Sequence, residues 1–465
     1  MAKQTIMTEG SIWKKILFFS IPLILGNLFQ QLYNTVDSVI VGNFIGSNAL
    51  AAVSCGGSVI NLLIGFCIGA SAGAGVVIAQ FYGAQNKEGV KKAVHTTLAI
   101  AVVAGIVVTI AGIALIPSML RLMGTPDEVY QDAVIYLQVY FGGMLFSVIY
   151  NMAAGILNAV GNSRRSLIYL MIAAVTNIVL DLLFVVVLKM GVVGVALATD
   201  ISQLLSCIFI IGFLVKSNDI YKVNLREIRF YKGLPGKIIK IGLPTGIQNI
   251  VIALSNVIIQ SSINSFGTIV MAGFASYVKI DGFNFLPVMS FSMAATTFTG
   301  QNIGAEKYDR VKKGMKVSLA MGMGYAMCTG LILYILAPQA MGIFTKDLEV
   351  VQCGVYLMKF FCPFYWILAF IHVMAGTIRG TGKTLPPMLI ILFSLCVFRI
   401  IWIATVVPVI GELYGLIMVY PLSFVVGAIL TIIYAIKGKW MPQAAKGEAE
   451  NGSFFRRPYQ VLWNK

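Results

Sequence analysis

The sequence predicts an all-α integral membrane protein in which twelve transmembrane helices form two parallel-repeat six-helix lobes with a central cleft. Three observations support this fold class. Apolar residues make up 58% of the 465 residues, charged residues make up only 11%, and the mean hydropathy is +0.87. Apolar runs of about 20 residues, long enough to cross a bilayer as a helix, recur along the whole chain. The second half of the chain also repeats the pattern of the first.

The apolar runs predict the helices in chain order. The first run continues from Ile16 to Ile45 without the small-residue cleavage pattern of a signal peptide, so we expect it to remain as a spanning helix. Loops that carry most of the charged residues separate the following runs. The predicted helices cover residues 16–45, 51–81, 94–118, 130–160, 166–188, 192–215, 241–266, 271–303, 317–340, 351–380, 385–409 and 413–437.

Basic residues alternate from loop to loop and predict the orientation of the helices. Lys and Arg are concentrated at the amino terminus, in every second loop and in the carboxy-terminal tail. The alternate loops contain only Arg121, Lys189 and Lys346 as basic residues, and acidic residues gather there. By the positive-inside rule, both termini are predicted to be cytoplasmic.

Net charge and cysteine content do not indicate other classes of protein. The net charge of +16 is spread over six loops and two tails, where membrane topology and anionic lipid headgroups explain it, so no nucleic-acid partner is expected. The seven cysteines lie in apolar segments without CxxC spacing, which favours buried free thiols over metal ligands. The polar, basic segment 441–465 is either a disordered tail or a weak interfacial anchor.

An internal repeat defines the domain organisation. Pro22 aligns with Pro244 at an offset of 222 (244 − 22), and after a one-residue slip Gln80 aligns with Gln301 at 221 (301 − 80). The longest charged segment between helices separates the two copies. The predicted parts are an amino-terminal lobe at 1–215, a cytoplasmic interlobe loop at 216–240, a carboxy-terminal lobe at 241–437 and a cytoplasmic tail at 438–465.

The repeat also predicts how the two halves lie in the membrane. Each copy contains an even number of helices, so both copies enter the membrane from the same side. They are therefore parallel repeats related by an axis along the membrane normal. Two such lobes around a cleft suit alternating access, in which one lobe rocks against the other around a site near the membrane midplane.

Four segments carry a resemblance to a known family. QFYGAQN and GQNIGAE end the second helix of each half, and AGILNAVGNS and AGTIRGTGKT end the fourth. Together with Pro22 in the first helix and Asp37 fifteen residues later, they resemble the multidrug and toxin extrusion (MATE) transporters of the MOP superfamily. The resemblance covers about residues 10–437 and implies two six-helix halves. Neither half contains the basic, Gly-rich loop of a major-facilitator transporter.

Acidic residues inside apolar helices are the first candidates for a functional site. These residues are Asp37, Asp181, Asp200 and Asp281. Each costs about 2.5–3.5 kcal/mol at a helix centre on insertion scales, so each needs a partner or a use. The repeat does not preserve them, because Asp37 aligns with Ile259 and Asp181 aligns with Trp402. We therefore expect the ionisable site in the first lobe alone.

The spacing of polar residues predicts that two helices contribute to one site. Asn177 and Asp181 are four residues apart and face the same side of their helix. Thr199 follows Asp181 by 18 residues (199 − 181), where an antiparallel helix could return it to a similar depth. If Asp37 and Asp181 converge in a low-dielectric pocket, the pair should take a proton or hold a hard cation. Alternatively, both acids only hydrogen-bond to neighbouring helices.

The MATE resemblance implies an ion site of this composition. The ion-binding set that it assigns is Asp37, Asn177, Asp181 and Thr199, with Na⁺ as the candidate metal ion. It also implies an Asn on the 130–160 helix, for which we choose Asn158, with Asn151 as the alternative, because spacing does not fix the choice. The resemblance further implies that the first helix bends near Pro22 when the ion binds. Pro permits bending because it removes one backbone hydrogen bond.

Other intramembrane polar residues are candidates for roles outside the ion site. The candidates for gating or for a substrate cleft are Asp200, Gln260 and Asp281. Asp200 fits gating and packing equally well, and Asp281 forms either a charge-compensated patch with Lys279 or part of a cleft that attracts cations. One branch of the MATE family carries acids on its seventh and tenth helices, whereas here the 241–266 helix offers only Gln260 for that role and the 351–380 helix offers no acid. The departure from that pattern means that we do not expect an ion site in the second lobe. Arg399 is expected to pair with another group or to snorkel, and His372 is expected to be a satisfied helix contact, so neither is assigned to a site.

The predicted function is ion-coupled multidrug efflux by antiport. The resemblance implies H⁺ or Na⁺ as the coupling ion, organic cations of amphipathic character as substrates, and no cofactor. It implies a monomeric, multi-pass protein of the plasma membrane that contacts lipids. The antiport mechanism requires the ion and the drug to prefer different states, since a ligand with equal affinity for both shifts nothing.

Three other functions are weighed against antiport. A flippase for a lipid-linked saccharide is the main alternative, but it would need a wide basic cleft, and the intramembrane ionisable residues here are mostly acidic. An enzyme is not expected, because the chain has two histidines and no HExxH motif or nucleophile elbow. A channel is disfavoured by the two-lobe repeat.

Overall fold

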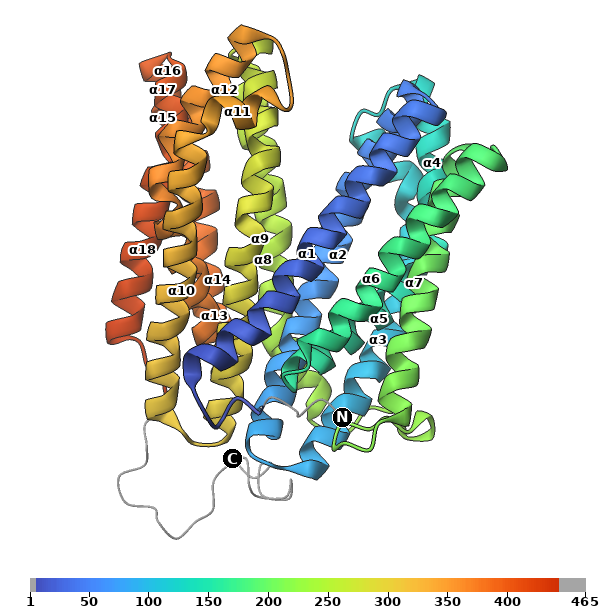
Figure 1. The fold of residues 1–465 in the computed structure, drawn as a ribbon, viewed down its shortest axis with the longest axis vertical. Coiled ribbons are helices and arrows are strands. Elements are labelled where there is room, and N and C mark those ends of the chain that lie inside the picture. The colour runs from blue at the N-terminus through green and yellow to red at the C-terminus, as the bar shows by residue number, and fades with distance from the viewer. Residues whose placement is uncertain (1–5, 443–465) are drawn as a thin grey trace. The chain divides into compact units, whose positions relative to one another are not determined.

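The computed structural model describes residues 6–442, and every regular element in that range is a helix (Figure 1). The chain divides into two compact units. The first unit contains Ile21–Gly246, and the second contains Met7–Ser20 together with the described chain from Ile247 onward. The 441–465 segment was interpreted as either a disordered tail or a weak interfacial anchor, and its residues beyond 442 lie outside the described range.

The first unit is built around one central helix. Its elements are α1 (Ile12–Phe44, from Ile21), α2 (Ser47–Gly83), α3 (Lys87–Leu122), α4 (Asp127–Gly142), α5 (Met144–Ala159), α6 (Ser163–Asp181), η1 (Leu182–Val187), α7 (Gly191–Lys216), η2 (Leu225–Glu227) and the start of α8 (Leu234–Asn264). α5 packs against α2, α3 and α7, and α6 packs against α7. Small residues on α5, such as Ala153 and Gly155, allow the close helix contacts that stabilise bundles in a membrane.

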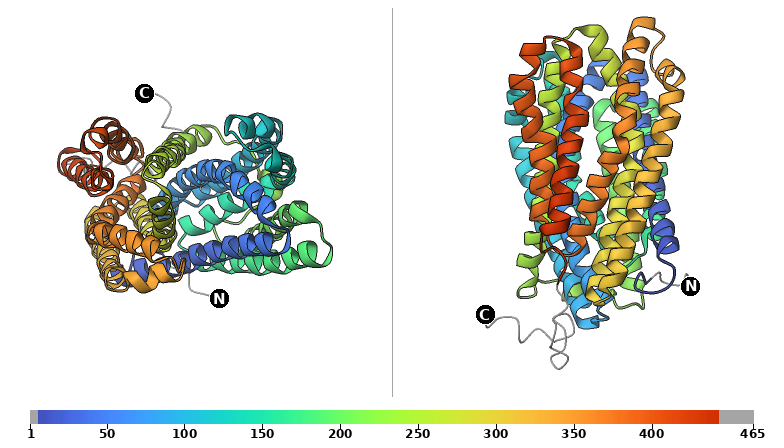
Figure 2. Two further views of the ribbon diagram at one scale, coloured as in Figure 1. Left: turned by 90° about the horizontal axis from the view of Figure 1, so that it is seen from above. Right: turned by 90° about the vertical axis from the view of Figure 1, so that its left-hand side faces the viewer.

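The second unit repeats this plan. Its elements are α9 (Thr268–Gly304), α10 (Tyr308–Ile335), α11 (Ala337–Gly342), α12 (Leu348–Phe361), η3 (Cys362–Phe364), α13 (Tyr365–Gly380), α14 (Leu385–Leu392), η4 (Phe393–Val397), α15 (Phe398–Thr405), α16 (Val407–Ile410), α17 (Leu413–Ile417) and α18 (Val419–Lys437). α13 takes the place of α5 and packs against α9, α10 and α18. The long helices of this unit run side by side (Figure 2).

Turn geometry repeats at the predicted register. α2 and α9 are both 37 residues long, and their N-caps are Gly46 with φ +124° and Gly267 with φ +99°, which are 221 residues apart (267 − 46). Gly161 and Gly382, with φ of 87° and 90°, keep the same spacing (382 − 161). Glycine is favoured at these turns because side chains resist positive φ. The repeat detected in the sequence is therefore a repeat of backbone conformation.

Several predicted helices are interrupted in the structure, including those at 130–160, 351–380 and 317–340. The 130–160 segment bends by 50° between α4 and α5, around Gly143. The 351–380 segment changes to a 3₁₀ turn at η3, where Pro363 cannot donate a helical hydrogen bond. The 317–340 segment ends as α10 and is followed by the short α11. Apolar residues continue through all three breaks, so hydropathy alone could not locate them.

Long apolar helices agree with the predicted fold class. Ten segments within the described residues are long and apolar enough to span a membrane, and the bent α4–α5 pair is an eleventh. α9 is also long enough, but Lys279, Asp281 and Asn284 interrupt its apolar sequence. With α9, the described part of the chain contains the twelve long segments that the sequence predicts.

Candidate ion-binding site

Asn177 and Asp181 lie one turn apart on α6, as their spacing predicts. Both are buried, with exposed fractions of 2% and 0%. Asp181 is the last residue of α6, and the chain continues directly into the π-helical η1. Widened turns of this kind are frequent at functional sites. The carboxyl group of Asp181 is therefore held inside the first unit at a change of helix geometry.

Thr199 reaches the same site from the next helix. Asn177 donates a long hydrogen bond from Nδ2 to Oγ1 of Thr199, at 3.5 Å. The hydroxyl of Thr199 donates in turn to the backbone carbonyl of Val195, at 3.1 Å, one turn earlier on α7. The Thr199 oxygen thus faces Asn177 with its proton already donated to Val195, and its lone pairs can accept a hydrogen bond or coordinate a cation.

Asp37 brings a second carboxyl group to Asp181. The two side chains lie within hydrogen-bonding reach of each other. Neither oxygen of Asp181, nor Oδ1 of Asp37, nor Oδ1 of Asn177 receives a hydrogen bond from any residue that the structure describes. Two carboxylates are both acceptors, so their contact needs a shared proton or a cation. Four buried oxygen atoms without donors therefore converge on one place.

Tyrosine side chains form part of the surroundings and were not predicted. Tyr136 on α4 lies close enough to Asp37, Asp181 and Asp200 to interact with all three electrostatically. Its ring is 6.1 Å from that of Tyr140, one turn later on the same helix. The i, i+4 spacing of two tyrosines beside a Gly-Gly break is a signal that could have identified them.

Asn158 hydrogen-bonds to a residue other than the acids, and its place in the ion site stays a prediction. Its Oδ1 accepts a hydrogen bond from Ser166 Oγ at 3.3 Å, near the first turn of α6. Ser166 precedes Asp181 by fifteen residues (181 − 166), which is about 22 Å along a helix. Asn151, the alternative, donates from Nδ2 to the Ser147 carbonyl on its own helix. Sequence spacing within α5 could not show which residue lies level with Asp181.

Pro22 lies inside α1, which continues through it. The boundary between the two units falls at Ser20 and Ile21, directly before this proline. Pro244 occupies the matching place in α8, just before the boundary at Gly246 and Ile247. Each proline removes one helical hydrogen bond. Both helices therefore pass from one unit to the other at a locally weakened point.

Comparison with known sequences decides the family. The sequence profile of the MatE family matches residues 22–183 and 244–405, which together exceed half of the chain. The chain belongs to the MatE family. The two matched segments begin at Pro22 and Pro244, so the family pattern follows the same repeat as the sequence. The first MatE segment includes Asp37, Asn177 and Asp181.

Relatives match this MatE protein over nearly its whole length. The probable multidrug resistance protein YoeA of Bacillus subtilis is 28% identical over 442 residues, covering 92% of this chain and 94% of that protein. YpnP of the same organism, also named a probable multidrug resistance protein, is 27% identical and covers 93% and 97%. An outward-facing structure of a multidrug resistance MATE family transporter of the MOP superfamily matches with a TM-score of 0.88 and 24% identity, covering 94% of this chain and 98% of that one. The predicted fold class is confirmed.

Asp200 has a structural partner in this MatE protein. Its carboxyl group hydrogen-bonds to the backbone at Gly143, where α4 and α5 meet. A Cβ placed on Gly143 would lie 2.2 Å from an Asp200 oxygen, so only glycine lets the carboxyl approach. Asp200 thus accepts a hydrogen bond from the backbone at the bend. Of the two roles that the sequence left open, gating and packing, this contact corresponds to packing.

The second MatE segment also contains buried charged groups. Asp281 hydrogen-bonds to Tyr365 and interacts with Arg399. Arg399 is 6% exposed, donates to Ser423 at 2.9 Å, and lies 4.4 Å above the ring of Tyr420. Arg399 is thus a buried positive charge that interacts with Asp281, and the two alternatives for Asp281, a patch compensated by Lys279 or part of a cleft that attracts cations, stay predictions.

Two further polar residues lie apart from these charges. Gln260, on the exposed side of α8, donates to Asn264 at 2.8 Å. His372 is 4% exposed and packs edge-on against Phe285, with ring centres 5.0 Å apart. Gln260 thus has a neighbour on its own helix. His372 is held by an aromatic contact.

Proposed function

We propose that this MatE protein is an ion-coupled antiporter that exports amphipathic organic cations, with Asp37 and Asp181 as the coupling pair. One observation carries the proposal: two carboxyl groups meet in the first unit, and three of their four oxygen atoms receive no hydrogen bond from the described residues. The two carboxyl groups are stable together when they share one proton or bind one cation. Without that ion, their two negative charges repel each other. Occupancy of the site therefore changes the stability of any conformation that brings the two acids together.

Coupling follows from this difference between the loaded and empty site. α1 carries Asp37 and α6 carries Asp181, so a proton or Na⁺ stabilises the arrangement in which these helices meet. Loss of the ion drives the helices apart. If the drug binds better to the state with the empty site, ion entry expels the drug, because each ligand shifts the equilibrium by its differential affinity. Pro22 provides a weakened point at which α1 can bend.

The oxygen atoms at the site suit either coupling ion. A proton needs only the two carboxyl groups. Na⁺ prefers several oxygen ligands, and Asn177 Oδ1 and Thr199 Oγ1 supply two besides the carboxylates. We expect the two ions to compete for one site. No cofactor takes part in this mechanism.

Small-molecule drugs are the proposed substrates, and the plasma membrane is the proposed location. Support comes from the multidrug resistance names of YoeA and YpnP, and from the acidic residues Asp37, Asp181 and Asp200 inside the apolar helices of the first unit. Acidic groups disfavour the phosphate groups of a lipid-linked saccharide. The alternation of basic loops supports cytoplasmic termini. We propose a monomer surrounded by lipid, since each lobe carries its own central helix.

Transport in proteoliposomes tests the proposal. Purified protein is reconstituted, Na⁺ and pH gradients are imposed separately, and movement of a fluorescent organic cation such as ethidium is followed. We expect at least one gradient to drive the cation uphill, and the matching ionophore to abolish that movement. Downhill leakage of the cation at the same rate under all gradients would contradict antiport.

A further inference from the structure

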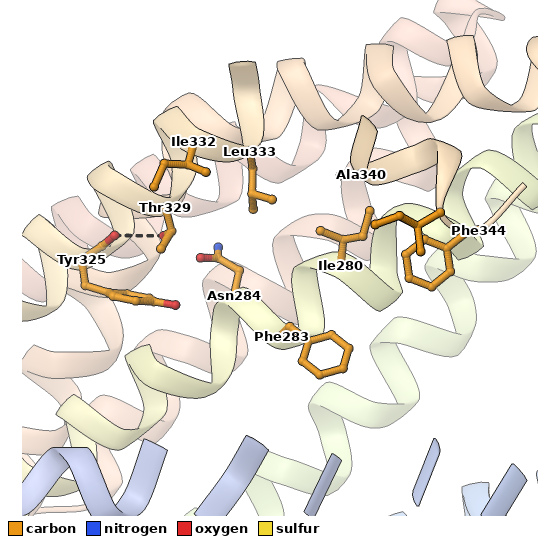
Figure 3. Close-up of a pocket in the computed structure, with 10 residues that line it drawn as sticks. Ile280, Phe283, Asn284, Tyr325, Thr329, Ile332, Leu333, Ala340 and Phe344 are labelled. Atoms are coloured by element: carbon orange, nitrogen blue, oxygen red, sulfur yellow. Dashed lines mark hydrogen bonds between the residues drawn. The ribbon is translucent and has the colours of Figure 1, made fainter. Parts of the chain in front are cut away.

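The second unit contains a cavity that the proposed ion site does not use. It has a volume of about 360 Å³ and lies between α9, α10 and the chain around α11 (Figure 3). Its walls are mainly apolar and aromatic, a composition typical of small-molecule sites, and the volume lies in their usual range. The residues that carry the argument are Phe283, Asn284, Tyr325, Leu333, Ala340 and Phe344.

Asn284 is the polar group that distinguishes this cavity from an apolar notch. Its side chain is 7% exposed, and Oδ1 has no hydrogen-bond partner among the described residues. The amide points into the cavity from α9, toward α10 (Figure 3). The nearby Thr329 hydroxyl does not serve it, because that hydroxyl donates to the Tyr325 carbonyl at 2.9 Å. A buried acceptor without a donor is unfavourable unless a ligand supplies one.

The fold does not require an amide at this position. α2 and α9 are equal in length and begin at equivalent glycines, so the register that pairs Gly46 with Gly267 also pairs Leu63 with Asn284. The first unit builds the same helix with leucine. Asn284 is therefore an addition to the second unit that helix formation does not explain.

Charges around the cavity indicate an uncharged ligand. Lys279 lies near its edge, with Nζ 5.8 Å from the ring centre of the lining residue Phe344. Asp281, the nearest acid along α9, instead bonds to Tyr365, which does not line the cavity. Lys279 is thus a positive charge near the edge of the cavity and repels cations. The apolar walls disfavour anions.

We propose that this cavity binds an uncharged aromatic small molecule that donates one hydrogen bond to Asn284. The ligand class differs from the organic cations proposed for transport. The inference does not rest on ion coupling, because binding is measured without a gradient. A protein that failed the transport experiment would still be expected to bind here.

A matched pair of photoreactive probes tests the proposal on the full chain in lipid nanodiscs. 4-Hydroxybenzophenone has one phenolic donor and is uncharged in mildly acidic buffer, and 4-methoxybenzophenone has nearly the same shape without the donor. Adducts are located by peptide mass spectrometry. We expect the hydroxy probe to label the α9 and α10 walls roughly threefold to tenfold more than the methoxy probe, the range that one hydrogen bond provides.

Variants separate specific binding from filling of the notch by lipid or probe. Asn284→Leu should remove the preference for the hydroxy probe, and Ala340→Phe should fill the cavity and remove both adducts. Ala404→Phe, at an exposed site on α15, is the matched control and should label as the wild type does. Equal labelling by both probes, a preference that survives in Asn284→Leu, or no adduct on the lining residues would each overturn the proposal. If Asn284→Leu fails to fold, the probe comparison in the wild type and Ala340→Phe decides.

Discussion

Gly376 on α13 lies so close to Ser292 on α9 that a Cβ on the glycine would be 2.3 Å from the Ser292 carbonyl oxygen. The first unit has the same contact, where a Cβ on Gly155 would lie 2.2 Å from Ser71 Oγ. Both pairs are 221 residues apart (376 − 155 and 292 − 71). The glycines of AGILNAVGNS and AGTIRGTGKT therefore mark the closest approach of the central helix to its neighbour in each unit.

Replacing Gly376 should destabilise the second unit. A methyl group at this point would meet backbone rather than a flexible side chain, so Gly376→Ala must separate α13 from α9. We expect a loss of roughly 1–3 kcal/mol, seen as a lower Tm of the purified protein. Gly324→Ala on α10 is the matched control, because nothing lies within 4 Å of the added Cβ. Equal Tm values for the two variants would contradict the close-contact interpretation.

Thr199→Val should distinguish the two coupling ions. The substitution keeps the shape of the side chain but removes the oxygen that accepts from Asn177. We expect Na⁺-driven transport to need a higher Na⁺ concentration, while proton-driven transport stays close to the wild type. Thr377→Val is the control, because its hydroxyl bonds only to the Val373 carbonyl on its own helix. An unchanged Na⁺ dependence in Thr199→Val would remove Thr199 from the site.

Asp200 should matter for folding more than for coupling. Asp200→Asn keeps an acceptor for the backbone at Gly143, whereas Asp200→Leu leaves that donor unpaired at the α4–α5 bend. The leucine variant should lose roughly 1–3 kcal/mol of stability, measured as a fall in Tm. The asparagine variant should transport drug with a normal ion dependence. A well-folded Asp200→Asn protein without coupling would make Asp200 a gating residue instead.

The contact of Glu227 with α3 should weaken at low pH. Glu227 pairs with Lys91 at 2.7 Å, and this hydrogen bond holds the pKa of Glu227 below its usual value. A carboxyl with a lowered folded pKa stabilises the attachment above its unfolded pKa, and the stabilisation is lost as pH falls through the folded pKa. We expect faster amide exchange around Glu227 in Glu227→Gln than in wild type at neutral pH, with the difference vanishing in acid.

The matched control for this experiment is Glu88→Gln. Glu88 pairs with Lys92 at 2.6 Å at the start of α3, outside the segment between the halves. Loss of the Glu88–Lys92 ion pair should leave amide exchange around Glu227 unchanged. The backbone bond from Asn224 to His95, at 3.0 Å, should persist in both variants. A pH-independent difference between Glu227→Gln and wild type would exclude the ion pair as its cause.

Much of the fold could be predicted because hydropathy and repeat act over long stretches. Both the twelve apolar segments and the 221-residue offset between the two copies of the repeat could be recognised in the sequence. Gly46 and Gly267 begin equivalent helices, as that offset requires. The break at Gly143 could not be recognised from hydropathy, because the residues around it remain apolar through the bend. Such a break depends on a partner far along the chain, here Asp200, and periodicity contains no information about that partner.

Parts of the candidate site followed from spacing, and other parts could not. Asn177 and Asp181 share a helix, so the i, i+4 rule placed them together. Spacing could not place Asn158, because it lies on another helix, whose depth relative to α6 depends on packing and on the bend before α5. Tyr136 was not predicted, because a tyrosine in an apolar helix can have many structural roles unrelated to a functional site. The assignment of Asp37 to the site came from family resemblance rather than from spacing.

Gradient-driven efflux by Asp37→Asn and Asp181→Asn is the most direct test of the central claim, that the two carboxyl groups form the coupling site. Each variant is reconstituted beside the wild type, and ethidium movement is measured with a gradient and as exchange without one. We predict that both variants lose uphill movement under Na⁺ and pH gradients but retain ethidium exchange, since the fold and the drug site remain. Full gradient-driven transport by both variants would contradict the account.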